Sequence, residues 1–171
     1  SAASDVYKRQ GATIRLIESI LSTRPDLTLH VVVGPGFAHR QALESTLSKV
    51  PANCVVLNEN LPSLADLFNR CDIGFTAGGN TLAELSCVGT PALVASEDPH
   101  EDEQGMVFER RGFGCWIGRG ISVSRRRIRD ALNVFDDPSV RNRHCRVGKA
   151  LVDGKGCERI VRLVSCLLYT S

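Results

Sequence analysis

Short apolar runs rich in β-branched residues alternate along this chain with stretches in which apolar residues recur every three or four positions. In the first stretch Ile14, Ile17 and Leu21 fall on one face, which is typical of an amphipathic helix. Residues 28–33 (TLHVVV) then form a nearly continuous apolar run, as expected of a strand buried on both sides in a parallel sheet. The chain is therefore predicted to open with a helix followed by a buried strand.

The alternation continues through most of the chain. Further strands are expected over residues 54–57, 72–76, 91–95 and 115–117, and further helices over residues 38–49, 62–69, 81–88 and 101–111. Pro62 suits the first turn of a helix, Gly89 and Gly112 stand where glycine ends one, and two or three more helices follow from about Val123. This order predicts an α/β fold, a Rossmann-like parallel sheet with helices on both faces.

Ligands of open parallel sheets bind beyond the carboxyl ends of the strands. The predicted loops at that edge are residues 34–37, 58–61, 77–80 and 96–101. Residues 34–36 lack the third glycine of a dinucleotide-binding fingerprint, and the chain contains neither a phosphate-binding P-loop nor a nucleophile elbow. Residues 153–156 (DGKG) fit a turn between two C-terminal helices better than a phosphate loop.

The two ends of the chain read like translated adapter DNA. The word GATGTGTATAAGAGACAG, a transposon-type sequencing adapter, encodes the DVYKRQ of residues 5–10, and its reverse complement in a shifted frame encodes the CLLYTS of residues 166–171. We therefore expect residues 1–10 and 166–171 to be adapter-derived tails and residues 11–165 to be one native domain.

Charge and cysteine content restrict the binding partners, the metals and the cellular location to be expected of this protein. The formal net charge of +2 falls to about +1 without Asp5, Lys8 and Arg9, so nucleic acid is not an expected partner. No apolar run approaches the roughly 20 residues needed to cross a bilayer, so membrane insertion is not expected. The basic run at residues 125–129 is interpreted as a solvated helix face. Six cysteines within residues 11–165 are scattered without metal-binding spacing, which predicts reduced thiols, as in a cytoplasmic protein, and no bound metal. No cofactor is expected. They are Cys54, Cys71, Cys87, Cys115, Cys145 and Cys157.

Residues 72–91 (DIGFTAGGNTLAELSCVGTP) carry the most informative pattern. A strand runs into Gly78 and Gly79 and then directly into a helix, whose first N–H groups and dipole favour a diphosphate. A plain strand–helix turn needs only one of these glycines. Glu84, about one turn into the helix, can accept two hydrogen bonds from a ribose diol. The spacing Thr81-x-x-Glu84 equally fits a capping box, in which Glu84 only bonds back to the Thr81 N–H.

The pattern A-G-G-N-T-x-x-E-L-x-x-x-G-T-P of residues 77–91 resembles the C-terminal domain of nucleotide-sugar enzymes with the two-Rossmann-domain (GT-B) fold. The chain resembles more closely the family of the UDP-sugar hydrolase of pseudaminic acid synthesis and the related spore-coat polysaccharide proteins. Residues 31–37 (VVVGPGF), 101–112 and 151–160 (LVDGKGCERI) carry this closer likeness. It covers most of residues 11–165 and implies the C-terminal half of a GT-B fold without its first strand.

The resemblance implies roles for particular residues. The diphosphate would be held by Gly78, Gly79, Asn80 and Thr81, and the ribose by Glu84.

A second group of residues is implied to contact the base and the sugar. The strand end at Asn58 would meet the uracil, mainly through backbone groups, while Glu101 and Gln104 would touch the sugar or phosphate. Glu101 and Gln104 equally suit an ordinary polar helix start, and close relatives often carry histidine at the position of Gln104. His100 is a candidate acid or base, although a lone loop histidine is more often structural.

The implied function is binding of a UDP-sugar between two Rossmann domains of a polysaccharide or nonulosonic acid enzyme, most closely a hydrolase that releases UDP from an amino-deoxy sugar. The expected partners are the nucleotide sugar and an N-terminal domain of the same parent chain. That domain would supply the general base, so the catalytic residues are not assigned here and the chain alone is expected to be inactive. The alternatives are a glycosyltransferase, a non-catalytic donor-binding subunit and a sugar epimerase.

Overall fold

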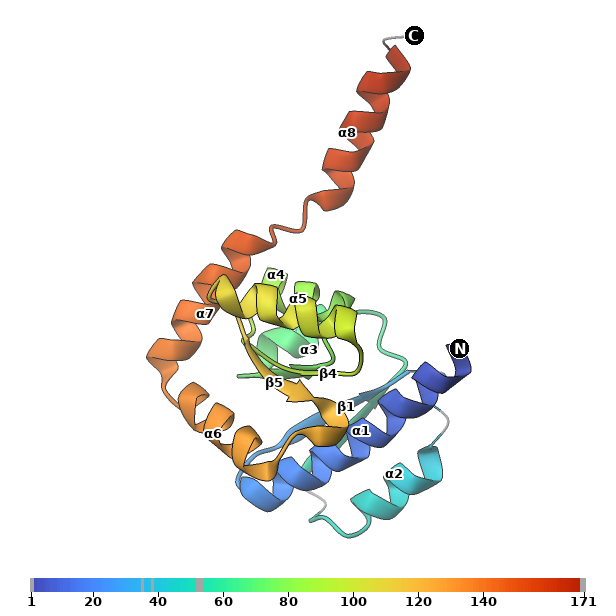
Figure 1. The fold of residues 1–171 in the computed structure, drawn as a ribbon, viewed down its shortest axis with the longest axis vertical. Coiled ribbons are helices and arrows are strands. Elements are labelled where there is room, and N and C mark those ends of the chain that lie inside the picture. Colours follow the sequence, from blue (N-terminus) through green and yellow to red (C-terminus); the bar gives the residue numbers. More distant parts are fainter. Residues whose placement is uncertain (1, 35, 38, 52–53, 170–171) are drawn as a thin grey trace.

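A computed structural model describes residues 2–34, 36–37, 39–51 and 54–169 (Figure 1). Strands and helices alternate as the sequence predicts, with boundaries that differ by a few residues. In chain order the elements are α1 (Ala2–Thr23), β1 (Leu29–Val33), α2 (Arg40–Leu47), β2 (Val55–Glu59), α3 (Ala65–Arg70), β3 (Gly74–Thr76), α4 (Asn80–Val88), β4 (Ala92–Ser96), α5 (Pro99–Arg110), β5 (Cys115–Arg119), the short 3-10 helix η1 (Gly120–Ser122), α6 (Arg125–Phe135), α7 (Pro138–Leu151) and α8 (Gly156–Tyr169).

Helix ends follow local chemistry. Gly89 ends α4 with a φ of 90° and Gly112 follows α5 with a φ of 87°, as their positions predict. Helix α3 begins at Ala65 rather than at Pro62, and the Ser63 hydroxyl accepts a hydrogen bond from the Ala65 N–H at 3.2 Å. The helix start predicted at Pro62 is therefore wrong, because a side-chain bond in the preceding turn takes up the first free amide.

The strands form two parallel sheets instead of the single sheet predicted. One sheet pairs β1 with β2, and the other has the order β3-β4-β5. No ladder among the described residues joins β1 to β3. All pairings are parallel, as expected for strands connected by crossing helices.

One face of both sheets is covered by α1, α2 and α6. Under α1 and α2, Ile17 packs with Val31, Val33 and Leu43. Ile20, one turn further along α1, packs instead in the cluster that β4 and β5 form with α6. Helix α1 thus spans both sheets, between α2 and the β5–α6 segment (Figure 1).

The opposite face is covered only over β3-β4-β5. There Leu82 and Leu85 of α4 and Val94 of β4 pack with Phe113 and with side chains of α3, α5 and α7. Every residue of β4 is buried. This half therefore has a helix layer on each side.

Strand β1 departs from the sequence expectation. Val31 and Val33 are buried, whereas Val32 is 41% exposed, as is Val56, which lies opposite His30 in the ladder. The prediction that residues 28–33 form a strand buried on both sides is wrong, because among the described residues no helix covers the face that carries Val32.

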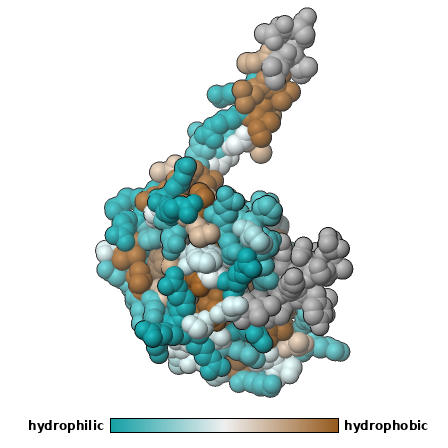
Figure 2. All heavy atoms as spheres, viewed as in Figure 1, coloured by the Kyte–Doolittle hydropathy of each residue, from teal (hydrophilic) through white to brown (hydrophobic). Residues whose placement is uncertain are grey.

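The chain ends in two helices, α7 and α8, that are joined by a short turn. Residues 153–156 form a turn between α7 and α8, as predicted, with Gly154 at a φ of 74° and the Lys155 N–H bonded to Asp153 at 3.0 Å. Helix α8 extends away from the rest of the molecule and exposes an apolar strip (Figure 2). The strip consists of Ile160, Val161, Leu163 and Val164.

The cysteines are free thiols, as their spacing predicts. Burial raises the pKa of Cys115 to about 11, so this thiol stays protonated at neutral pH. In the part of the chain that the structure describes, no helix is long and apolar enough to cross a membrane.

Candidate functional site

The turn between β3 and α4 lies at the carboxyl edge of its sheet. Gly78 has a φ of 116°, and a Cβ there would lie 2.9 Å from the Glu101 carbonyl oxygen, so only glycine fits. At Gly79 a Cβ would meet nothing closer than a Glu101 carboxylate oxygen at 3.9 Å. The backbone therefore requires one of the two glycines. The space beside Gly79 stays open to a ligand.

Helix α4 begins without a capping side chain. Its N-cap is Gly79, which has no side chain to accept a hydrogen bond, and Asn80 and Thr81 form the first turn. By contrast, α5, α6 and α7 are capped by Asp98, Ser124 and Asp137. The α4 start thus presents backbone N–H groups and the positive end of the helix dipole, the combination that binds phosphate groups.

The helix boundary bears on the two interpretations of Glu84. A capping box places its hydroxyl residue at the N-cap and its carboxylate at the third helical position. Here Gly79 is the N-cap, and Thr81 and Glu84 are the second and fifth residues of α4, so they have the spacing of a capping box but not its positions in the helix. Glu84 is exposed. This arrangement favours an outward-facing role over capping.

Glu84 lines a hollow of about 500 Å³ between α3 and α4. Leu61, Pro62 and Phe68 contribute apolar surface to it. None of these three was predicted as a site residue from sequence, although Leu61 ends the predicted ligand loop of residues 58–61 and Pro62 follows it, beyond the carboxyl end of β2. A carboxylate beside an apolar hollow can orient a sugar through its diol while the hollow takes a flat ring attached to that sugar.

Asn58 lies within β2, one residue before its end. Its side-chain amide donates to the Val56 carbonyl oxygen at 3.0 Å and lies 3.5 Å from the His30 ring. Contact of this strand end with a base stays a prediction, and the bonded side chain is consistent with a contact made mainly by backbone groups.

The start of α5 packs against the glycine turn. Asp98 caps it by accepting from the Glu101 N–H at 2.9 Å, and the buried Glu101 carboxylate accepts from the Glu97 N–H at 2.8 Å. Glu101 therefore holds the loop beside Gly78 and Gly79. Its contact with sugar or phosphate stays a prediction.

Two other candidates lie in the first turns of α5. Gln104 is half-buried and His100 is exposed. Helix α5 begins at Pro99, so both belong to the helix rather than to the preceding loop, which corrects the predicted placement of His100. Ligand contact by Gln104 also stays a prediction.

A polar network behind α5 was not foreseen from sequence. The fully buried Ser96 hydroxyl bonds to Asp102 and accepts from the Trp116 indole N–H at 2.9 Å, while the Arg119 guanidinium pairs with Asp102 at 2.8 Å. Bonding to Ser96, followed by pairing with Arg119, lowers the pKa of Asp102 below its usual value. The network fixes the α5 start relative to β4 and β5. No spacing of residues in the sequence indicates this network, because its members come from three separate elements.

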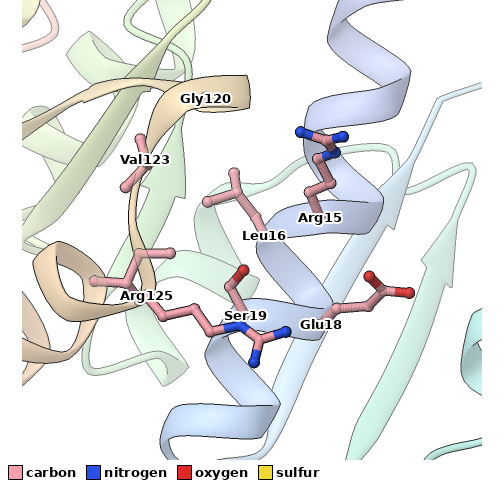
Figure 3. A pocket seen from close by; sticks show the side chains of 8 residues that line it. Arg15, Leu16, Glu18, Ser19, Gly120, Val123 and Arg125 are labelled. Carbon is pink, nitrogen blue, oxygen red and sulfur yellow. The ribbon is translucent and has the colours of Figure 1, made fainter.

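A second hollow, of about 300 Å³, lies away from the glycine turn, between α1 and the start of α6 (Figure 3). Leu16 and Ser19 of α1 face Val123 across it, the Arg125 side chain extends toward α1, and Glu18 also lines the hollow.

The basic run that supplies Arg125 is exposed throughout, as its solvated-face interpretation expects. The run consists of Arg125, Arg126, Arg127 and Arg129. Within the described ranges, no group of three or more His, Cys, Asp or Glu residues is arranged to hold a metal.

The parallel sheets, the glycine turn and the uncapped α4 start together define a Rossmann-like domain that resembles the C-terminal half of GT-B nucleotide-sugar enzymes. Among known proteins, the chain is 27% identical over 143 residues to the spore coat polysaccharide biosynthesis protein SpsG of Bacillus subtilis. The match covers 83% of the chain and 42% of SpsG, so the chain spans less than half of that relative. The uncharacterized protein MJ1062 of Methanocaldococcus jannaschii is 26% identical over 92 residues, which are 53% of the chain and 19% of that protein. No protein-family profile matches the chain.

Solved structures share the fold. The glycotransferase of kitacinnamycin superposes with a TM-score of 0.67 at 21% identity, over 87% of this chain and 38% of that one. A UDP-GlcNAc 2-epimerase from Neisseria meningitidis, solved with UDP-GlcNAc bound, superposes with a TM-score of 0.62 at 16% identity, over 94% of this chain and 40% of that one. These likenesses confirm the predicted α/β, Rossmann-like fold class.

Proposed function

We propose that this chain is the nucleotide-sugar-binding domain of a polysaccharide biosynthesis enzyme. The observation that carries the proposal is the start of α4. There the space beside Gly79 is open, the first N–H groups of the helix have no capping side chain, and the exposed carboxylate of Glu84 lies about one turn further along the helix. In this arrangement Gly79, Asn80 and Thr81 bind the diphosphate, and Glu84 accepts hydrogen bonds from the ribose. The apolar hollow beside Glu84 takes the base.

The same geometry accounts for a catalytic contribution of the domain. Negative charge develops on a diphosphate as it leaves the anomeric carbon, and preorganised N–H groups at a helix start stabilise that charge. The α4 start performs this role without side-chain movement. Glu101 and the network around Asp102 hold the adjoining loop in place.

For the complete reaction we propose hydrolysis of a UDP-linked sugar, with a general base supplied by an N-terminal domain of the parent chain. In this proposal residues 11–165 form the native unit, and the isolated chain turns over no UDP-sugar. A glycosyl transfer reaction uses the same donor site with a sugar acceptor in place of water. The fold neighbours support that alternative, since they include the glycotransferase of kitacinnamycin and the spinosyn rhamnosyltransferase SpnG, which superposes with a TM-score of 0.63 at 18% identity.

The test is calorimetric titration of UDP into the chain and into Glu84→Gln. Removing the carboxylate charge while keeping the shape should lower UDP affinity about 10- to 100-fold, because charge-assisted hydrogen bonds contribute roughly 1.5–3 kcal/mol. Thermal stability should stay unchanged, since Glu84 does not cap α4.

Glu158→Gln is the matched control, because Glu158 is an exposed carboxylate on the distant α8. It should leave UDP affinity unchanged. Equal affinity of Glu84→Gln and the wild type would contradict the ribose role. Absence of any UDP binding by the unaltered chain would contradict the donor site itself.

A further inference from the structure

Helix α8 follows the turn at residues 153–156 and extends away from the rest of the molecule (Figure 1). The four side chains of its apolar strip are between 50% and 65% exposed. None of the three apolar clusters that form the core of the described residues includes a residue of α8. A projecting helix that holds apolar residues in water indicates a contact surface rather than a part of the core.

The strip lies along one side of α8. With about 3.6 residues per turn, its four residues fall within an arc of roughly 160° around the helix axis. Arg162 lies on the opposite side, and Arg159 lies one turn before Leu163, at the border of the strip. Both arginines are exposed, and Arg159 pairs with Asp153. Apolar residues on one side and arginines on the other are typical of a helix that lies flat on a membrane surface.

Positive charge is concentrated in the part of the chain that carries α8. Residues 119–165 contain twelve Lys and Arg against five Asp and Glu, whereas residues 11–118 contain seven against thirteen. Residues 155–165 alone contain three against one. Arg146 and Lys149, in the last turns of α7, are exposed as well. Because a surface of one sign attracts a partner of the other, the partner of the strip is expected to be anionic.

The combination of apolar and basic surface distinguishes between anionic partners. Nucleic acid would contact the arginines through its phosphates but would leave the strip in water. A second copy of the chain would cover the strip but would bring two basic surfaces together. An anionic lipid surface satisfies both parts, because the boundary of the acyl chains takes the apolar side chains and the headgroups take the cations.

We propose that α8 is a peripheral contact with an anionic lipid surface. Its strip lies in the boundary between headgroups and acyl chains, while Arg159 and Arg162 contact lipid phosphates, and Arg146 and Lys149 add attraction at longer range. Such a helix lies in the plane of the surface and does not cross it. The contact is separate from the start of α4, so it does not depend on nucleotide binding.

The test is cosedimentation of the full chain with vesicles of phosphatidylcholine alone and with vesicles that contain about 30% phosphatidylserine. At about 0.1 M salt the partition coefficient should be at least about tenfold higher for the anionic vesicles, because each basic residue near the surface adds attraction. This preference should fall as the salt concentration rises to about 0.5 M. Equal binding to both kinds of vesicle, or no binding to either, overturns the proposal.

The apolar contribution is tested by Val161→Ser combined with Val164→Ser. This variant should lower the partition coefficient for the anionic vesicles at least about tenfold, because two apolar side chains no longer leave water on binding. Val134→Ser is the matched control, since Val134 is a valine of α6 that is 54% exposed. It should leave binding unchanged, and an equal loss in the control overturns the role of the strip.

The contribution of charge is tested by Arg159→Gln combined with Arg162→Gln. This variant should reduce the preference for anionic vesicles at least about fivefold. Arg126→Gln combined with Arg129→Gln removes the same net charge from exposed positions of α6 and should have a smaller effect. Equal effects of the two pairs would mean that net charge alone attracts the chain, which overturns the placement of α8 on the surface.

Three further outcomes assign the strip to another contact and overturn the proposal. The first is loss of binding by a chain that ends at Ser165, because the strip lies before that residue. The second is self-association in sedimentation without vesicles that the serine variant of α8 weakens. The third is protection of the α8 amides from hydrogen exchange in a longer parent chain without vesicles. UDP affinity stays constant in all variants of α8, so failure here leaves the proposed nucleotide-sugar site intact.

Discussion

Strand β1 of the β1–β2 sheet and strand β4 of the β3–β4–β5 sheet are both mostly apolar, but the two sheets are covered differently. On the face away from α1, Val94 of β4 is 1% exposed beneath α4 and α5, whereas Val32 of β1 is 41% exposed. Both valines lie in the interior of a parallel strand. The difference shows that strand composition sets the tendency to be buried, while the connecting helices decide which faces are covered.

The largest contrast is expected from the same substitution in the two sheets. Val94→Ala removes buried methyl groups that contact the packing around Gly78 and Gly105, and should lower the free energy of unfolding by about 2–4 kcal/mol. Val32→Ala should lower it by less than about 1 kcal/mol, since much of that side chain is already in water. Urea unfolding of both variants measures the difference, and equal losses would contradict the unequal covering of the sheets.

The glycine turn gives the next largest contrast. Gly78→Ala places a Cβ 2.9 Å from the Glu101 carbonyl in a left-handed backbone and should destabilise the fold by about 1–3 kcal/mol. Gly79→Ala meets open space at a negative φ, so it should change stability by less than about 0.5 kcal/mol and instead weaken UDP binding.

Thermal melting and UDP titration of both glycine variants separate these effects. A destabilised Gly79→Ala, or one that binds UDP as tightly as the wild type, would show that the second glycine serves only the fold.

Much of the fold was predictable because local signals agreed with it. The glycines at positions 89 and 112 end helices as expected, and the strand–helix alternation gives the parallel arrangement. The separation into two sheets was not predictable. It depends on which strands lie next to each other, and an apolar run such as residues 28–33 carries no information about its neighbours.

The candidate site was predictable in part for the same reason. The glycine turn is a local feature, so its position follows from sequence. The choice between the two roles of Glu84 depended on the first residue of α4, and helix boundaries are poorly fixed by residue spacing. The Ser96–Asp102–Arg119 network and the hollow beside Glu84 join side chains from several elements, which no single stretch of sequence reveals.

The free energy of unfolding is expected to depend on pH through a histidine in the half of the molecule built around β3, β4 and β5. His144 of α7 is buried against Phe135, and its Nδ1 accepts from the Gly114 N–H at 2.9 Å, so the ring is neutral in the fold. Burial, and then the charge of Arg143, lowers the pKa of His144 below 6.5. The folded state consequently binds fewer protons than the unfolded state below about pH 6.5.

Stability from His144 is therefore present above that pH and is lost as the pH falls toward 5.5, by up to about 1.4 kcal/mol per pH unit. His144→Gln, which keeps an acceptor for Gly114, should flatten the urea-unfolding profile between pH 7.5 and 5.5. His100→Gln, at an exposed position, should leave the slope unchanged. An unaltered slope in His144→Gln would assign the pH dependence to another group.

The smallest effect is expected on the uncovered face, and it tests the comparison most selectively. Threonine has nearly the shape of valine, so Val→Thr adds a hydroxyl without opening a cavity. At Val32 that hydroxyl can reach water, and the free energy of unfolding should change by less than about 0.5 kcal/mol. At Val94 it would be buried among apolar side chains and should lower the free energy by about 1–3 kcal/mol. Urea unfolding of the two variants under one set of conditions gives both values.

A loss of stability at Val32 as large as that at Val94 would mean that the face carrying Val32 is covered in solution, for instance by a second copy of the chain. Sedimentation at two protein concentrations would then show association of the chain, and Val32→Thr would weaken that association.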